Sequence, residues 1–419
     1  MNRPNKLLNL IIVAIAITLI GCSCHSQKSG VIKKETDMLS FVDWSNGLPS
    51  TGQWREGIAF YDINGDGHLD IAAPGPRKAQ KGDDTPFFWY GNGKGEWSES
   101  RPEVPSDMGF YYGDIAVADF DGDGLTDMAF AMHGSGMKVL KGKAKGEYVD
   151  FSDGIPSQKE FMSRAIVSAD FNNDGIPDIA AVSEAMFGEG FPVPSGVRIC
   201  YLENSKWKCN PIGGETETLG LFADQLTVGD INGDGNKDIA VASLEHMRDL
   251  IVWTGDGKGA FVPFNIGLPT ECHYLSVALA DINGDGRDDL VASIGTLPGL
   301  GSKEFLGLKA FLSGSDAFKD ISDGLPTNEC FTSVRACDLD SDGKVEIVAA
   351  TIAGGVKIFS RKGACWHEMR VSGLPEKGLR KIKNLYCIDV NRDGRMDIAL
   401  NHSLGQNNSG GIRVFLNVP

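Results

Sequence analysis

The sequence predicts an all-β protein, a seven-bladed β-propeller whose N-terminal strand closes the last blade. Three observations predict this fold: an acidic nine-residue motif recurs seven times, each repeat contains four short strand patterns, and the two chain ends complement each other. Spacings of 51 to 60 residues between copies indicate one array of equal units. The motif is Asp-apolar-(Asn/Asp)-x-Asp-Gly-x-x-(Asp/Glu), and it begins at Asp62, Asp119, Asp170, Asp230, Asp281, Asp338 and Asp389.

The first residues are typical of a targeting segment. Arg3 and Lys6 precede an almost entirely apolar run at 7–20, and residues 19–22 resemble a bacterial lipobox ending in Cys22. We expect a signal peptide at 1–21, a lipidated Cys22 with a polar tether to residue 37, and the propeller at 38–419. A transmembrane anchor is the alternative, but the apolar run is short for a full span. The chain is therefore predicted to be exported and membrane-anchored through its lipid only, in the periplasm or on the cell surface.

Each repeat is expected to form one four-stranded blade. In the second repeat the strand patterns lie at 115–118, 128–131, 137–140 and 148–151, with the acidic motif between the first two. The second strands are continuously apolar and small, as in Ile71-Ala72-Ala73, which indicates sheets covered on both faces. Radial blades that converge on a common axis meet this requirement. Gly-Leu-Pro or Gly-Ile-Pro turns separate blades, and they begin at Gly47, Gly154, Gly267, Gly324 and Gly373.

The chain ends supply the closing strand. The last repeat stops after its third strand, 411–416, whereas residues 40–44 match the fourth-strand pattern of residues 148–151. We expect residues 40–44 to complete the seventh blade, which leaves the ring without a long free strand edge.

These features resemble a known family. From about residue 38 onward the chain is similar to the FG-GAP/VCBS repeats that build seven-bladed propellers, as in the integrin α-subunit head. In the integrin-type propeller only some blades carry calcium loops, whereas all seven motifs are complete here. The chain also lacks the further integrin domains, so the partners of that family do not transfer to it.

The motif offers hard oxygen ligands at fixed offsets, as calcium prefers. Side chains at positions one, three, five and nine and the carbonyl at position seven supply the oxygens, and glycine at position six suits a backbone turn. The expected cofactor is calcium, up to seven structural ions. The predicted ligands are Asp62, Asn64, Asp66, His68, Asp70, Asp119, Asp121, Asp123, Leu125, Asp127, Asp170, Asn172, Asp174, Ile176, Asp178, Asp230, Asn232, Asp234, Asn236, Asp238, Asp281, Asn283, Asp285, Arg287, Asp289, Asp338, Asp340, Asp342, Lys344, Glu346, Asp389, Asn391, Asp393, Arg395 and Asp397.

Other interpretations of the motif fit less well. An EF-hand needs an acid at position twelve, where this chain has strand residues such as Ala73 and Phe130. Magnesium demands a tight octahedral geometry and keeps several waters. Acidic hairpins without an ion would leave clustered carboxylates to repel one another.

Function is expected on the face opposite the acidic loops, here called the variable face. It carries the second-to-third strand loops and the blade connections, whose lengths differ strongly, and scaffolds usually carry function on variable loops. Side chains just before the first strands should ring its centre, where aromatic and charged groups suit a glycan or protein ligand. The ligand-binding candidates are Trp54, Arg55, Glu56, Tyr112, Arg164, Asp224, Tyr274 and Lys383.

The sequence favours a binding module over an enzyme, since it has no nucleophile elbow, HExxH or Walker motif. A polysaccharide lyase or hydrolase on the same scaffold is the alternative, with Glu56 and Asp224 as a carboxylate pair. Much of the net charge of −16 belongs to the acidic motifs, so it gives no support for nucleic-acid binding. Of the nine cysteines, Cys200 and Cys209 flank a turn pattern and are the predicted disulfide.

Overall fold

The computed structural model describes residues 38–54, 57–76, 85–106, 113–133, 135–183, 196–213, 221–246, 250–270, 273–295, 307–379, 381–403 and 410–419. These residues belong to a compact unit that runs from Glu35 to Pro419. The predicted signal peptide, Cys22 and the tether lie outside the described residues. Among the residues described, no helix combines the length and apolarity needed to cross a membrane.

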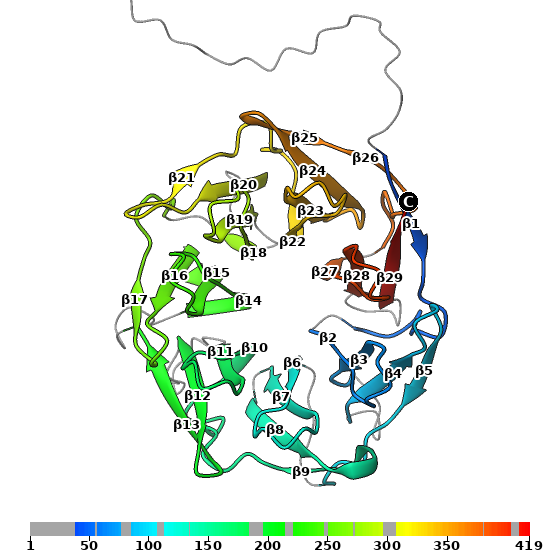
Figure 1. Ribbon diagram of the computed structural model, residues 1–419, viewed down its shortest axis with the longest axis vertical. Coiled ribbons are helices and arrows are strands. Elements are labelled where there is room, and N and C mark those ends of the chain that lie inside the picture. Colours follow the sequence, from blue (N-terminus) through cyan, green and yellow to red (C-terminus); the bar gives the residue numbers. More distant parts are fainter. Residues whose placement is uncertain are drawn as a thin grey trace, which may run out of the picture. The chain divides into compact units, whose positions relative to one another are not determined.

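The unit is a ring of seven antiparallel sheets, which confirms the predicted seven-bladed propeller (Figure 1). Blades one to three contain β2 (Ala59–Tyr61), β3 (Asp70–Ala73), β4 (Phe87–Gly91), β5 (Trp97–Ser100), β6 (Gly113–Ala118), β7 (Asp127–Met132), β8 (Gly136–Gly142), β9 (Tyr148–Asp150), β10 (Ser163–Ala169), β11 (Asp178–Ser183), β12 (Val197–Glu203) and β13 (Lys206–Ile212).

Blades four to seven contain β14 (Leu221–Gly229), β15 (Asp238–His246), β16 (Leu250–Gly255), β17 (Phe261–Pro263), β18 (Tyr274–Ala280), β19 (Asp289–Ile294), β20 (Gly307–Leu312), β21 (Lys319–Asp320), β22 (Phe331–Cys337), β23 (Glu346–Thr351), β24 (Val356–Lys362), β25 (Cys365–Glu368), β27 (Ile382–Ile388), β28 (Asp397–Ser403) and β29 (Gly410–Val418). The four strands of each blade follow the predicted order, with the first strand innermost (Figure 1).

The core lies between blades. The described residues form seven apolar clusters, one for each pair of neighbouring blades, and each combines second- and third-strand side chains of both partners. Second-strand residues such as Ile71, Ala240 and Leu400 are fully buried. Because both faces of every sheet are covered in this way, the second strands are continuously apolar, as their sequences indicate.

The ring closes through β1 (Met38–Asp43), as predicted. This strand pairs antiparallel with β29, with Val42 opposite Leu416 and Asp43 opposite Phe415. It also pairs in parallel with β26 (Arg370–Ser372), a strand that the sequence patterns did not predict. The closing sheet therefore has five strands and extends the seventh blade toward the sixth.

The glycine turns between blades lie against the outer strand of the next blade. Gly154 has a φ of 92°, and a Cβ there would lie 1.9 Å from the carbonyl oxygen of Trp207. The Trp207 backbone amide donates to Asp153 O at 2.8 Å, and its indole nitrogen donates to Phe151 O at 2.8 Å. Only glycine permits this approach, which links the rims of blades two and three.

The predicted disulfide between Cys200 and Cys209 is present and joins β12 to β13 directly across the strand pair.

We expect the closing strand to be essential for cooperative folding. A variant that lacks residues 38–48 should aggregate or melt without a cooperative transition, because it loses the buried side chains of Leu39, Phe41 and Leu48 and exposes the edge of β29. A variant that lacks only residues 1–37 is the matched control and should melt like the mature protein. Equal melting curves for the two truncations, recorded by circular dichroism, would refute this role of β1.

Candidate functional site

The seven acidic loops share one hydrogen-bonded geometry, shown here by the second. The Asp119 carboxylate accepts the backbone amides of Asp123 and Gly124 at 3.1 and 2.8 Å, and Asp123 accepts that of Leu125 at 2.9 Å. Glycine at position six has φ between 81° and 91° in all seven loops, as its predicted turn requires. These bonds wrap the backbone around the carboxylates at positions one and five.

The position-nine carboxylate ties each loop to its blade. Asp127 is fully buried; its Oδ2 accepts the amide of Phe120 at 2.9 Å and its Oδ1 accepts that of Gly142, the last residue of β8, at 2.7 Å. Asp70, Asp238, Asp289 and Asp397 make the same pair of contacts. One carboxylate thereby fixes both the start of the loop and the end of the third strand.

Burial makes these carboxylates costly to ionise. It outweighs their hydrogen bonds and raises the pKa to about 6 in Asp70, Asp127, Asp238, Asp289 and Asp397, and to about 7 in Asp178 and Glu346. A cation beside such a group would favour its ionised form.

The ligand set fits a hard divalent cation. Asp119, Asp121 and Asp127 each present an oxygen within 4.8 Å of the others, and Asp338, Asp340 and Glu346 do the same in the sixth loop. Asp121 Oδ1 is buried and has no hydrogen-bond partner among the described residues. Side-chain oxygens at these separations are the donors that calcium binds.

The second candidate region is the channel at the centre of the ring. Arg164, Asp224 and Lys383, here called the channel network, form two buried ion pairs at the variable-face ends of β10, β14 and β27. Arg164 Nε lies 2.6 Å from Asp224 Oδ1, and Lys383 Nζ contacts the other carboxylate oxygen. Burial opposes ionisation of Asp224, but the two cations outweigh it and hold the pKa of this carboxyl well below its usual range.

A cavity of about 280 Å³ lies beyond this network. Gln225 and Leu226 line it and follow Asp224 along β14, while Asn384 and Tyr386 follow Lys383 along β27. Because the first strands run from the variable face toward the acidic loops, the cavity is on the acidic-loop side of the network.

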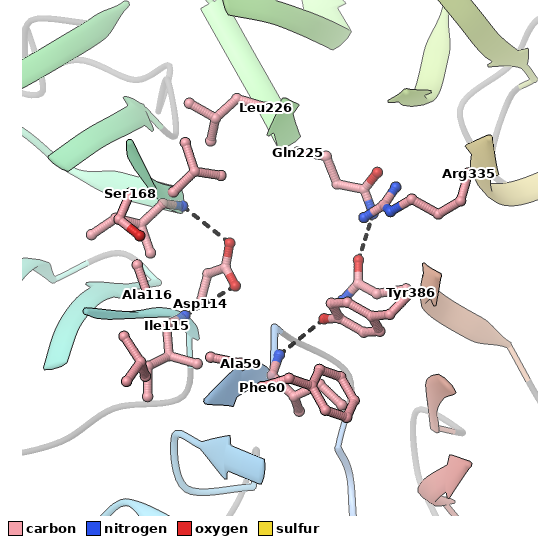
Figure 2. A pocket seen from close by; sticks show the side chains of 15 residues that line it. Ala59, Phe60, Asp114, Ile115, Ala116, Ser168, Gln225, Leu226, Arg335 and Tyr386 are labelled. Carbon is pink, nitrogen blue, oxygen red and sulfur yellow. Dashed lines mark hydrogen bonds between the residues drawn. The ribbon is translucent and has the colours of Figure 1, made fainter. Parts of the chain in front are cut away.

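The polar groups of the cavity are largely engaged with one another (Figure 2). Asp114 accepts the amides of Ile115 and Ile166, and Gln225 donates to Asn384. Tyr386 accepts the amide of Ile58 at 2.9 Å. The bonds of Asp114 to Ile166 and of Tyr386 to Ile58 join neighbouring blades, and the Gln225–Asn384 bond joins blades four and seven, so they hold the ring together at its inner edge.

One cation lies in the cavity wall. Arg335 donates to the carbonyl of Val334 at 2.7 Å, and its guanidinium carbon lies 5.8 Å from the centre of the Tyr386 ring. Burial lowers the pKa of this guanidinium.

The structure brings together three of the eight predicted ligand-binding residues, those of the channel network. Trp54 instead lies in the apolar cluster between blades seven and one, in edge contact with Phe87 and Trp89. Tyr274 is fully buried in the cluster between blades four and five. Arg55, Glu56 and Tyr112 lie outside the described residues.

Sequence reasoning missed the cavity residues Asp114, Gln225, Arg335, Asn384 and Tyr386. The available signal was their position: each lies three or five residues before its acidic motif, inside the first strand.

Comparison with known proteins identifies the repeat and the fold. The FG-GAP-like repeat family matches residues 119–181 and 230–292, each match running from one acidic loop to the second strand of the next blade. No curated protein matches the chain. Among solved structures, the chain is similar to one titled "Crystal structure of BBS1N in complex with ARL6DN, soaked with lead". That match has a TM-score of 0.50, 11% sequence identity, and coverage of 90% of this chain and 96% of the other; at this identity it shows the fold alone.

We expect the channel network to contribute strongly to stability. Asp224→Asn leaves two buried cations without their carboxylate, so the free energy of unfolding should fall by about 3–5 kcal/mol. Asp153→Asn is the control, because the Asp153–Lys206 pair is 74% and 63% exposed and should contribute little. Chemical denaturation measures both variants. If the two variants have the same free energy of unfolding, the channel network does not contribute to stability in this way.

Proposed function

Because the chain carries FG-GAP-like repeats and forms a seven-bladed propeller, a fold suited to an interaction module, we propose that it is a calcium-stabilised, lipid-anchored extracytoplasmic binding protein. Its ligand is a glycan or a protein, bound on the variable face. The observation that carries the proposal is the separation of two ends: seven acidic loops at one end of the blades and a charged network at the other.

Calcium as the stabilising ion is supported by the loops themselves. Each wraps its backbone around several carboxylates, and burial raises the pKa of the position-nine carboxyl, as for Asp178 and Glu346. A divalent cation would neutralise this charge without requiring a proton. The ions stabilise and do not catalyse, because every blade carries the same loop and no loop resembles a unique active centre.

The charge of the channel network supports a ligand on the variable face. Two cations, Arg164 and Lys383, surround one carboxylate, Asp224, so these three described residues together carry one positive charge in excess. That charge favours a ligand with an anionic group, such as an acidic polysaccharide or an acidic peptide segment. The network also occupies the channel, so we place the ligand across the surrounding variable loops and not deep in the ring.

The catalytic alternative gains no support from Asp224. A glycosidase acid needs a raised pKa, whereas the neighbouring cations hold the pKa of Asp224 low, so this carboxyl has no proton to donate near neutral pH. The role of an ionised nucleophile or base also fits poorly, because Arg164 and Lys383 hold the two oxygens of Asp224, so we retain binding as the proposed activity.

The lipid anchor rests on the lipobox-like sequence that ends at Cys22. Cys22→Ser should release the protein from the membrane fraction, and sedimentation of the variant with the envelope would refute the anchor.

We expect calcium removal to lower the melting temperature sharply. At a hundredfold excess over Kd, an ion that binds only the folded state stabilises it by about 2.7 kcal/mol per site, so several sites would dominate a typical net stability of about 5–15 kcal/mol. Calcium should restore the melting temperature after chelation better than magnesium does.

Single substitutions localise this effect. Asp285→Ala or Asp289→Ala should weaken the fifth blade, whereas Asp316→Ala, an exposed acid in the third-to-fourth strand turn of that blade, should not. The calcium proposal is wrong if chelator leaves the melting temperature unchanged and metal analysis finds no calcium.

The binding proposal is tested with a panel of acidic and neutral polysaccharides and peptides. The purified mature protein should retain an acidic member of the panel without releasing reducing or unsaturated ends. Lys383→Met should weaken retention, and Lys94→Met, in the third-to-fourth strand turn of blade one at the acidic-loop end, is the charge-matched control. Product formation would favour the enzyme alternative, and retention of no acidic ligand would contradict the proposal.

A further inference from the structure

The acidic loops differ at position three, which is asparagine in five of them and aspartate in the second and sixth. In all five asparagine loops the side-chain amide donates to Oδ2 of the position-five aspartate at 2.9–3.0 Å. Asn64 bonds Asp66 in this way. The amide therefore holds the outer oxygen of the position-five carboxylate.

An ionised aspartate cannot provide this bond, because a carboxylate only accepts hydrogen bonds. Asp121 would instead place a second negative charge beside Asp123. In the second loop a lysine from the neighbouring strand lies between the two groups: Lys141 Nζ contacts Asp121 Oδ2 and lies 2.8 Å from Asp123 Oδ2. Its side chain is only 17% exposed and its ammonium lies 5.8 Å from the centre of the Phe151 ring.

Lys141 is an exception among the seven blades. It follows Leu140, which pairs with the residue after position nine, and strand register identifies the equivalent residue in each blade. The six equivalents are all uncharged: Tyr90, Tyr201, Thr254, Leu312, Ser360 and Leu416. A lysine at this strand position therefore occurs in a blade whose acidic loop has aspartate at position three.

The sixth loop also has an aspartate at position three, but its nearby lysine is more exposed. Its position-three residue is Asp340. The lysine that reaches position five is Lys344, which is 66% exposed and, among the described residues, pairs with Asp342 alone. Lys141 instead bridges both carboxylates from a partly buried position.

The bridge also changes the inner oxygen of Asp121. In the other six loops the position-three Oδ1 accepts the position-five amide at 2.9–3.2 Å. Asp121 Oδ1 accepts no hydrogen bond from any described residue, although it is buried. Its carboxylate is held from outside by Lys141 and keeps its inner oxygen free.

We propose that Lys141 is the positioning residue of the second loop: its ammonium replaces the asparagine amide of the other loops, offsets the additional charge of Asp121, and leaves Asp121 Oδ1 available to a cation. The last element rests on the proposed calcium binding. The first two concern the ion-free loop and stand independently of it.

A double-mutant cycle tests this role. In chelator, Lys141→Met should raise amide exchange of residues 119–127 about tenfold, the effect of losing one charge-assisted hydrogen bond. Asp121→Asn in the same variant should return exchange to near the wild-type rate, because the new amide can bond Asp123 as Asn64 bonds Asp66. Saturating calcium should suppress the effect of Lys141→Met.

The experiment includes control residues, and it distinguishes failure of the Lys141 proposal from failure of the calcium proposal. Lys138→Met removes a lysine from the same strand, β8, and should change nothing, while the other six loops serve as references within each molecule. Unchanged exchange in Lys141→Met, or failure of Asp121→Asn to rescue it in chelator, would overturn the proposed role of Lys141. If calcium protects no loop in any variant, the calcium proposal fails while the chelator arm still decides the role of Lys141.

Discussion

The structure depends most on the buried carboxylate at position nine of each acidic loop. This one group bonds the loop at its second residue, and in five blades it also bonds the end of the third strand, as Asp127 does with Phe120 and Gly142. Burial opposes its ionisation, so every blade has an electrostatic cost at the same place. Neighbouring blades share their apolar clusters, so a loop that loosens also disturbs the packing of the next blade. Neutralising the carboxylate charge in one loop should therefore also stabilise the packing of the neighbouring blades.

At the inner edge of the ring a buried carboxylate is also costly to ionise, and here protein side chains neutralise its charge. Asp224 is ionised because Arg164 and Lys383 flank it, and these three residues come from blades three, four and seven. Asp114 and Tyr386 accept backbone amides from neighbouring blades. Buried polar groups thus connect blades that are distant in sequence. The polar contacts in the channel stabilise the ring. A ligand must therefore bind without disrupting these contacts.

The sequence predicted the features that repeat. Seven copies revealed the loop chemistry and the glycine at position six, and the missing fourth strand after residue 416 predicted closure by residues 40–44. It did not predict what occurs once. Strand β26 extends to three residue pairs a parallel contact that is a single bridge at Asn46–Glu96 and Glu103–Glu147, and no repeat pattern gives this length. Trp54 lies between blades because aromatic packing with Trp89 stabilises it there. The partners of Asp224 come from positions 60 and 159 residues away, and no local pattern encodes such pairings.

Lys141 shows how a repeat accommodates variation. A substitution of asparagine by aspartate at position three keeps an oxygen ligand but removes a donor and adds a charge, and a repeat that tolerates this needs a compensating donor nearby. The strand pairing supplies one place for it, next to the carboxylates and beside the end of the third strand, where the other blades have uncharged residues. The requirement is local, because the ammonium must reach both Asp121 and Asp123. A change at position three of the motif should therefore be interpreted together with the facing residue of the third strand. These two residues together determine the net charge of the cation site.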